Sequence, residues 1–121
     1  MEKTVLVADD FDDDRHLMKF ILESYEYKVI EANDGENAVE MFKLHSPDLI
    51  LMDLAMPGMD GLTATKTIRS LEKGNDIPIF AVTAHGRHFY EKVIAAGCSG
   101  LIDKPVDFNS LTSTISRYFE E

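Results

Sequence analysis

The sequence near the N-terminus reads Thr4-Val5-Leu6-Val7-Ala8-Asp9-Asp10, an apolar run that ends on two adjacent acids. An apolar run without polar alternation is typical of a central parallel strand, because such a strand is buried on both faces. Acids that directly follow it lie at the carboxyl end of the strand, where open α/β sheets bind their ligands. This stretch therefore predicts a parallel sheet with an acidic site at one edge.

Four more short apolar runs follow, at residues 28–32, 49–52, 79–82 and 100–102. The segments between and after them carry apolar residues at the spacing of amphipathic helices. These are Leu17, Ile21 and Tyr25 flanked by Met18 and Leu22; Ala38, Val39 and Phe42; Ala64, Ile68 and Leu71; Phe89, Val93 and Ala96; and Leu111, Ile115 and Tyr118. Five strand-helix pairs in strict alternation predict one α/β domain over residues 1–121, with helices on both faces of a parallel sheet.

Local signals mark the expected helix ends. Residues 12–14 are all Asp and offer a cap and an acidic first turn to the first helix. The second helix must end before Pro47. Gly74 and Gly97 follow the third and fourth helices, where a left-handed residue commonly ends a helix.

Composition narrows the class of protein. The chain has 45% hydrophobic and 28% charged residues, which excludes a disordered chain, and its sequence shows neither a membrane span nor a signal peptide. We therefore expect a soluble cytoplasmic protein. The net charge of -10 argues against direct binding to nucleic acid or to an anionic membrane. The single cysteine, Cys98, is expected to be a buried thiol, and no spacing predicts a zinc site.

Polar residues stand at the ends of four expected strands. Asp9 and Asp10 follow the first, Asp53 the third and Lys104 the fifth, and Thr83 ends the fourth. Carboxylates about 5 Å apart repel by roughly 3 kcal/mol per pair at an effective dielectric near 20, so they ionise together only beside a cation. Lys104 supplies one positive charge. The remaining negative charge on oxygen ligands suits Mg²⁺.

The acidic run itself has two interpretations. Residues 12–14 fall where the first helix starts, and we interpret them as a solvated helix N-terminus. Asp9 and Asp10 directly follow an apolar strand, and we interpret them as functional.

The chain resembles the receiver domains of two-component response regulators, including the single-domain chemotaxis type. The resemblance covers the whole chain and rests on four motifs in register: Asp9-Asp10, Asp53 with Met56-Pro57-Gly58-Met59-Asp60-Gly61, Thr83-Ala84, and Lys104-Pro105. It implies a flavodoxin-like, doubly wound sheet of five parallel strands in the order 2-1-3-4-5 with five helices.

The resemblance also implies the roles of the strand-end residues. Asp53 would accept a phosphoryl group from a phosphohistidine of a sensor histidine kinase or histidine phosphotransfer protein. Asp10, Asp53 and the backbone carbonyl of Ala55 would hold Mg²⁺, with Asp9 acting mainly through water. Lys104 and the Thr83 hydroxyl would bind the phosphoryl oxygens.

The family implies further features. In members of the family, the peptide bond that corresponds to Lys104–Pro105 is typically cis, so we expect a cis bond here. The face formed by the fourth helix, fifth strand and fifth helix would contact an output protein. Leu101 stands where many members have Tyr or Phe, and Ala55 where many have a polar side chain. Ala55 and His85 would flank the path of water to the phosphoryl group, and an exposed loop residue is the alternative interpretation of His85. The function implied is a phosphorylation-dependent signalling switch that catalyses only its own phosphorylation and slow dephosphorylation.

Two rival functions fit the residues less well. Phosphohydrolases of the haloacid-dehalogenase type also use an Asp nucleophile and Mg²⁺, but they usually carry a second Asp where this chain has Ala55. A flavin-binding module would need a phosphate-binding loop after the first strand, where Asp9 and Asp10 would repel the phosphate. The cognate kinase, the output and whether the receiver stands alone or belongs to a hybrid kinase remain open.

Overall fold

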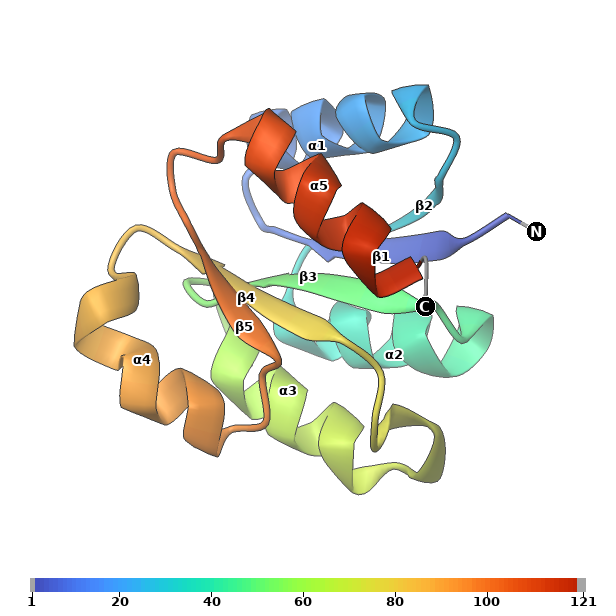
Figure 1. Cartoon of the computed structure of the whole chain (residues 1–121). Coiled ribbons are helices and arrows are strands. Elements are labelled where there is room, and N and C mark those ends of the chain that lie inside the picture. Colours follow the sequence, from blue (N-terminus) through green and yellow to red (C-terminus); the bar gives the residue numbers. More distant parts are fainter. Residues whose placement is uncertain (1, 120–121) are drawn as a thin grey trace.

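The computed structural model describes residues 2–119 as strands and helices in alternation (Figure 1). The strands are β1 (Thr4–Ala8), β2 (Lys28–Ala32), β3 (Leu49–Asp53), β4 (Ile79–Thr83) and β5 (Gly100–Asp103). The helices are α1 (Asp12–Ser24), α2 (Gly35–His45), α3 (Gly61–Ser70), α4 (Gly86–Ala95) and α5 (Phe108–Phe119), and a 3-10 turn, η1 (Glu72–Gly74), follows α3. None of the helices in this part of the chain has the length and apolar character needed to cross a membrane.

The five strands form one parallel sheet in the order β2-β1-β3-β4-β5. The chain first moves outward from β1 to β2, then returns to place β3 on the other side of β1. The strand order therefore reverses between β1 and β3, and the carboxyl ends of these two strands border the crevice where such folds bind ligands. The flavodoxin-like fold and its strand order are confirmed.

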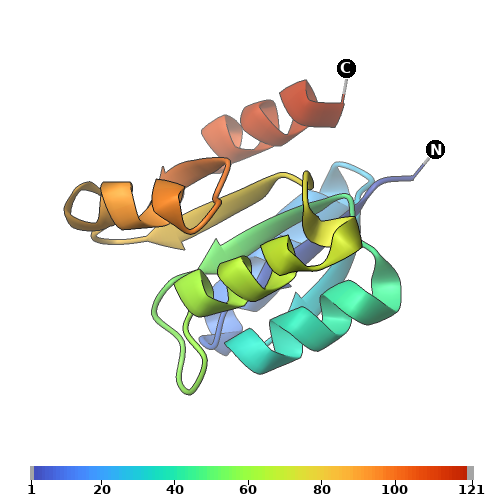
Figure 2. The same ribbon diagram turned by 90° about the horizontal axis from the view of Figure 1, so that it is seen from below.

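Helices cover both faces of the sheet. Figure 1 shows α1 and α5 on one face and α2, α3 and α4 on the other; Figure 2 shows this second layer from below, with α2 and α3 side by side. In β1, Val5 and Val7 face the layer of α1 and α5, whereas Leu6 and Ala8 face the opposite layer. Both faces of β1 are thus buried, which explains its unbroken apolar sequence.

The expected core face of α1 was wrong in part. Leu17 and Tyr25 are 48% and 51% exposed, whereas Met18 and Leu22 are buried. Both sets have helical spacing, so the sequence alone does not choose between them. Arg15 lies on the same face as Met18 and Leu22 and is also buried, because it bonds to groups on β2 and the β1–α1 loop. The buried face of α1 therefore combines these polar contacts with the apolar packing of Met18 and Leu22.

The expected helix ends were largely confirmed. Helix α2 ends at His45, and Ser46 has a left-handed φ of 45° before Pro47. Gly97 follows α4 with a φ of 104°, as expected. The left-handed conformation expected at Gly74 was wrong: Gly74 lies in η1, and an added Cβ would collide with the carbonyl oxygen of Ile68.

Two further local predictions were tested. Residues 12–14 form the acidic first turn of α1, but the N-cap is Phe11 and no side chain caps this helix. Cys98 is buried as predicted, with its Sγ 3.8 Å from the Thr65 hydroxyl.

Candidate functional site

The strand-end residues meet at one edge of the sheet. Asp53 and Thr83 are the last residues of β3 and β4. Asp9 and Lys104 are the residues that directly follow β1 and β5. Because all strands are parallel, these ends lie together. The Lys104 Nζ is 3.3 Å from Asp53 Oδ2 and 3.6 Å from Asp9 Oδ2. The convergence expected from the sequence is present.

Three carboxylates form the acidic part of the site. Asp9, Asp10 and Asp53 each offer one oxygen, and these oxygens lie within 4.8 Å of one another. Asp9 and Asp53 are 1% and 4% exposed, whereas Asp10 is exposed. The cluster is therefore open to solvent on the side of Asp10.

Backbone amides hold the two buried carboxylates. The Phe11 amide donates to Asp9 Oδ1 at 2.9 Å, and the Ala55 amide donates to Asp53 Oδ1 at 3.0 Å. The second oxygen of each carboxylate points to Lys104, but Asp9 Oδ2 is buried and accepts no hydrogen bond from residues 2–119. A buried carboxylate oxygen without a hydrogen bond is costly, so this oxygen favours a cation.

The donor set fits Mg²⁺. The three side chains offer only carboxylate oxygens, which are hard ligands, and the exposed Asp10 side leaves room for the water molecules that Mg²⁺ usually retains. Asp9, Asp10 and Asp53 therefore could hold the ion in this arrangement, with the Ala55 carbonyl next to Asp53 along the chain.

Burial and charge set the protonation of the site. Burial raises the pKa of Asp9, although the hydrogen bond from the Phe11 amide lowers it, and the nearby Asp53 carboxylate raises the pKa further. Burial opposes the charge of Lys104, but the attraction of Asp53 and Asp9 is stronger overall and raises the pKa of the ammonium group. Lys104 is thus a permanent cation held between acids.

Thr83 joins the site to α4. Its buried hydroxyl oxygen accepts a hydrogen bond from the His85 amide at 3.1 Å, and its carbonyl accepts one from the Lys104 amide at 2.9 Å. Thr83 and His85 line one cavity of about 340 Å³ together with Ala55 and Phe89. The Lys104–Pro105 peptide bond is cis, as the family resemblance implied.

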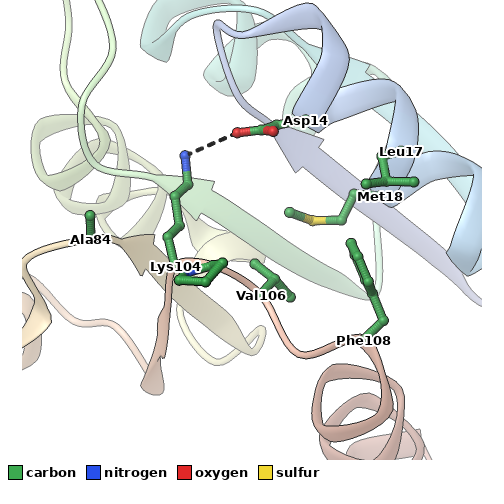
Figure 3. Close-up of a pocket in the computed structure, with 8 residues that line it drawn as sticks. Asp14, Leu17, Met18, Ala84, Lys104, Val106 and Phe108 are labelled. Atoms are coloured by element: carbon green, nitrogen blue, oxygen red, sulfur yellow. Dashed lines mark ion pairs between the residues drawn. The ribbon is translucent and has the colours of Figure 1, made fainter.

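Asp14 is one residue that the sequence interpretation missed. Its Oδ2 lies 3.7 Å from Lys104 Nζ (Figure 3), so Asp14 is more than part of a solvated helix start. It borders a mostly apolar groove of about 450 Å³ between α1 and the segment that follows β5, lined also by Leu17 and Phe108. No local pattern signals this contact, because the two partners are brought together only by packing of α1 against the sheet.

Arg15 is the second residue that was missed. Its Nη1 donates to the Asp9 carbonyl at 2.9 Å, its Nε to Glu31 Oε1 at 3.1 Å and its Nη2 to Asp12 Oδ1 at 2.7 Å. The only signal in the sequence is its spacing of three and seven residues from Met18 and Leu22, which places a charged residue on an apolar helix face.

Comparison with known proteins identifies the family. The model of the response regulator receiver domain matches residues 5–116 of the chain. The chain belongs to this family of receiver domains. The receiver domain is 33% identical over 119 residues to the polar-differentiation response regulator DivK of Brucella ovis, and the match covers 98% of this chain and 97% of DivK.

Solved structures agree with this assignment. The receiver domain of a Pseudomonas aeruginosa sensor histidine kinase, with a magnesium ion coordinated in its active site cleft, has a TM-score of 0.92 and 30% identity over 100% of both chains. The chemotaxis protein CheY4 of Vibrio cholerae has a TM-score of 0.92 and 27% identity, covering 97% of this chain and 98% of that one.

Family membership settles the class of function. The chain is a signalling receiver domain of two-component systems, a phosphorylation-dependent switch and not a dedicated enzyme. The phosphohydrolase and flavin-binding alternatives are therefore set aside. Receiver domains bind Mg²⁺ at an acidic site and interact with histidine kinases and output partners.

Proposed function

We propose that this receiver domain, taken as residues 1–121, accepts a phosphoryl group on Asp53. The donor is a phosphohistidine of a sensor histidine kinase or a histidine phosphotransfer protein. The observation that carries the proposal is the position of Asp53: a buried carboxylate at a strand end, with an ammonium group 3.3 Å away and two further carboxylates beside it. Asp9 is also buried beside Lys104, but within residues 2–119 only Asp53 accepts a hydrogen bond from the Lys104 ammonium group.

The transfer is a displacement at phosphorus. A carboxylate oxygen of Asp53 forms a P–O bond while the P–N bond to the donor imidazole breaks. The imidazole nitrogen leaves with the bonding electron pair and takes up a proton from water. Asp53 then carries an acyl phosphate.

The residues around Asp53 have distinct roles in this proposal. Asp10, Asp53 and the Ala55 carbonyl hold Mg²⁺, and Asp9 acts mainly through water. When bound, the ion offsets negative charge on the phosphoryl oxygens. Lys104 is already paired with Asp53 and provides the second positive charge for these oxygens.

Thr83 provides a hydroxyl donor. Its oxygen accepts the His85 amide, which leaves the hydroxyl hydrogen free to turn toward the phosphoryl group. A movement of Thr83 would therefore also pull on the backbone at the start of α4. This is the link that we propose between phosphorylation and the output surface.

Intact-mass analysis tests the phosphorylation site. Incubation with a small acyl phosphate and Mg²⁺ should add one phosphoryl group to the wild-type protein and none to Asp53→Asn. Asp13→Asn is the matched control, because it removes the same charge from an exposed position in the same acidic region. A label that persists in Asp53→Asn and maps to another residue would refute the assignment.

The face formed by α4, β5 and α5 is the proposed contact with an output protein. The helices that border this face carry exposed apolar residues: Tyr90 and Ile94 of α4 and Tyr118 of α5 are 55%, 44% and 44% exposed. Leu101 of β5 is partly buried beneath the start of α4, so the response should centre on the loop after Thr83 and not on a side chain of β5.

Hydrogen exchange tests this route. A beryllofluoride mimic of the phosphoryl group should increase protection of residues 83–90, and Thr83→Ala should reduce that response while the mimic still binds. Changes confined to other segments in the wild-type protein would rule out the Thr83 route.

The last part of the proposal concerns where the receiver domain acts and how slowly it loses the phosphoryl group. The chain has one cysteine, which is buried, and this fits the reducing cytoplasm. We infer that the receiver domain acts there and that it catalyses only its own phosphorylation and a slow loss of the phosphoryl group. Fractionation of cells that express the tagged protein checks the location.

A further inference from the structure

Asp10 lacks side-chain contacts that would hold its carboxylate. It is exposed, and none of the hydrogen bonds or ion pairs described for residues 2–119 involves its side chain. Its carboxylate nevertheless lies within 4.8 Å of the oxygens of Asp9 and Asp53. The position of the Asp10 side chain therefore depends on the backbone from which it projects.

Arg15 holds that backbone. Its Nη1 donates a buried hydrogen bond of 2.9 Å to the carbonyl oxygen of Asp9. The Asp9 carbonyl and the Asp10 amide belong to the same planar peptide unit. A guanidinium group that fixes this carbonyl thus fixes the orientation of the unit that leads into Asp10.

The guanidinium group is itself anchored. Glu31 of β2 accepts from its Nε at 3.1 Å, and Arg15 is only 9% exposed. The bond to Asp12 is more exposed, since 73% of the Asp12 side chain is accessible, and it contributes less. Arg15 therefore connects the β1–α1 loop to the sheet through one buried hydrogen bond, to the Asp9 carbonyl, and one partly buried ion pair, to Glu31.

We propose that Arg15 is a positioning residue for the Mg²⁺ site: through the Asp9 carbonyl it orients the peptide unit that presents the Asp10 carboxylate to the ion. This inference rests on the proposed function, in which Asp10 is a ligand. It adds a residue that touches neither the ion nor the phosphoryl group.

If only electrostatic attraction mattered, removal of Arg15 would make Mg²⁺ binding tighter. Arg15 is a positive charge close to the acidic cluster, so its removal would strengthen the attraction of a divalent cation. Loss of positioning weakens binding instead. Lys19 is a matched control, because it lies on the same helix and its Nζ also pairs with Glu31, at 3.3 Å, without contacting Asp9.

Calorimetric titration with Mg²⁺ separates these effects. We expect Arg15→Met to bind Mg²⁺ about tenfold more weakly than wild type, in the range found when groups that orient metal ligands are removed. Arg15→Lys keeps the charge but cannot make all three bonds, so we expect a smaller loss. Lys19→Met should stay within about twofold of wild type or bind slightly more tightly.

The variants are compared at a temperature where circular dichroism shows them fully folded, so that a loss of stability alone leaves the affinity unchanged. The amide signals of Asp10 and Phe11 in nitrogen-15 spectra should move in Arg15→Met and stay in place in Lys19→Met. If Arg15→Met does not fold, the weaker binding expected of Arg15→Lys decides the question.

Asp10→Asn separates failure of this inference from failure of the proposed function. If Asp10→Asn binds Mg²⁺ as wild type does, Asp10 is not a ligand and the proposed site is wrong. If Asp10→Asn weakens binding but the folded Arg15 variants bind as tightly as wild type or more tightly, the positioning role of Arg15 is overturned.

Discussion

Replacement of Asp9 by Asn should stabilise the receiver domain in the absence of divalent metal. The ionised Asp9 carboxylate is buried, and its Oδ2 lacks a hydrogen bond within residues 2–119. Asparagine has nearly the same shape and keeps an oxygen that can accept the Phe11 amide, as Asp9 Oδ1 does. The substitution therefore removes a buried charge with little change in packing.

The expected size follows from the neighbouring charges. Repulsion from Asp53 within 4.8 Å and attraction to Lys104 at 3.6 Å are each about 3–5 kcal/mol at an effective dielectric near 20. These two contributions have opposite signs and largely cancel, so the cost of burying the charge decides the outcome. We expect the free energy of unfolding to rise by about 1–2 kcal/mol. For a domain of this size, each kcal/mol corresponds to a rise of roughly 3–6 °C in the melting temperature.

Thermal and urea unfolding followed by circular dichroism measure this difference, because the chain has no Trp to report by fluorescence. The buffer contains a chelator, and Asp13→Asn controls for the change in net charge. With Mg²⁺ at twenty times its Kd, the wild-type protein gains about 1.8 kcal/mol, whereas Asp9→Asn should gain less. The stability advantage of the variant should therefore shrink as Mg²⁺ is added.

A less stable Asp9→Asn in metal-free buffer would refute this reasoning, since it would mean that Lys104 more than compensates the burial of Asp9. An advantage of the same size in Asp13→Asn would assign the effect to net charge. An advantage that is unchanged by Mg²⁺ would contradict a role of Asp9 near the ion.

Three further results are expected. Asn or Glu at Ala55 should change the rate of phosphoryl loss severalfold without preventing phosphorylation, and His85→Ala should change this rate as well, because both residues line the same cavity. Phosphate-release assays measure these rates, and rates equal to that of the wild type would exclude a role for both side chains. Burial raises the pKa of the Cys98 thiol above 9.0, so its alkylation by iodoacetamide should be slow in the folded protein, and rapid labelling at pH 8 would contradict this. The free energy of unfolding should also fall as the pH rises above 9.0, because the thiol ionises more readily in the unfolded chain than in the folded protein. Gly86→Ala should destabilise the fold by about 1–3 kcal/mol in urea unfolding, because the added Cβ would collide with Leu101; wild-type stability would show that α4 shifts freely.

Much of the fold follows from local sequence patterns. The apolar run of β1 and the helical spacing after it recur in five strand-helix pairs, and a parallel sheet then places Asp9, Asp53 and Lys104 at one edge. This inference needs only the chain direction, because every strand of a parallel sheet ends on the same side. For that reason the central site was predictable without any side-chain geometry. The strand order itself came from the family resemblance.

Other features depend on how α1 is rotated against the sheet. Leu17 and Met18 are adjacent and both apolar, yet only Met18 is buried, because it packs in the core between α1, the sheet and α5. Arg15 is on the same face of α1 and bonds there to Glu31 and to the Asp9 carbonyl. The same rotation brings Asp14 to within 3.7 Å of Lys104, some ninety positions away in the chain. Helical periodicity defines which residues share a face but not which face meets the sheet. The sequence by itself therefore determined the elements and the acids at their ends, whereas the tertiary structure decided which polar residues of α1 join the site, since that choice rests on contacts between segments far apart in the chain.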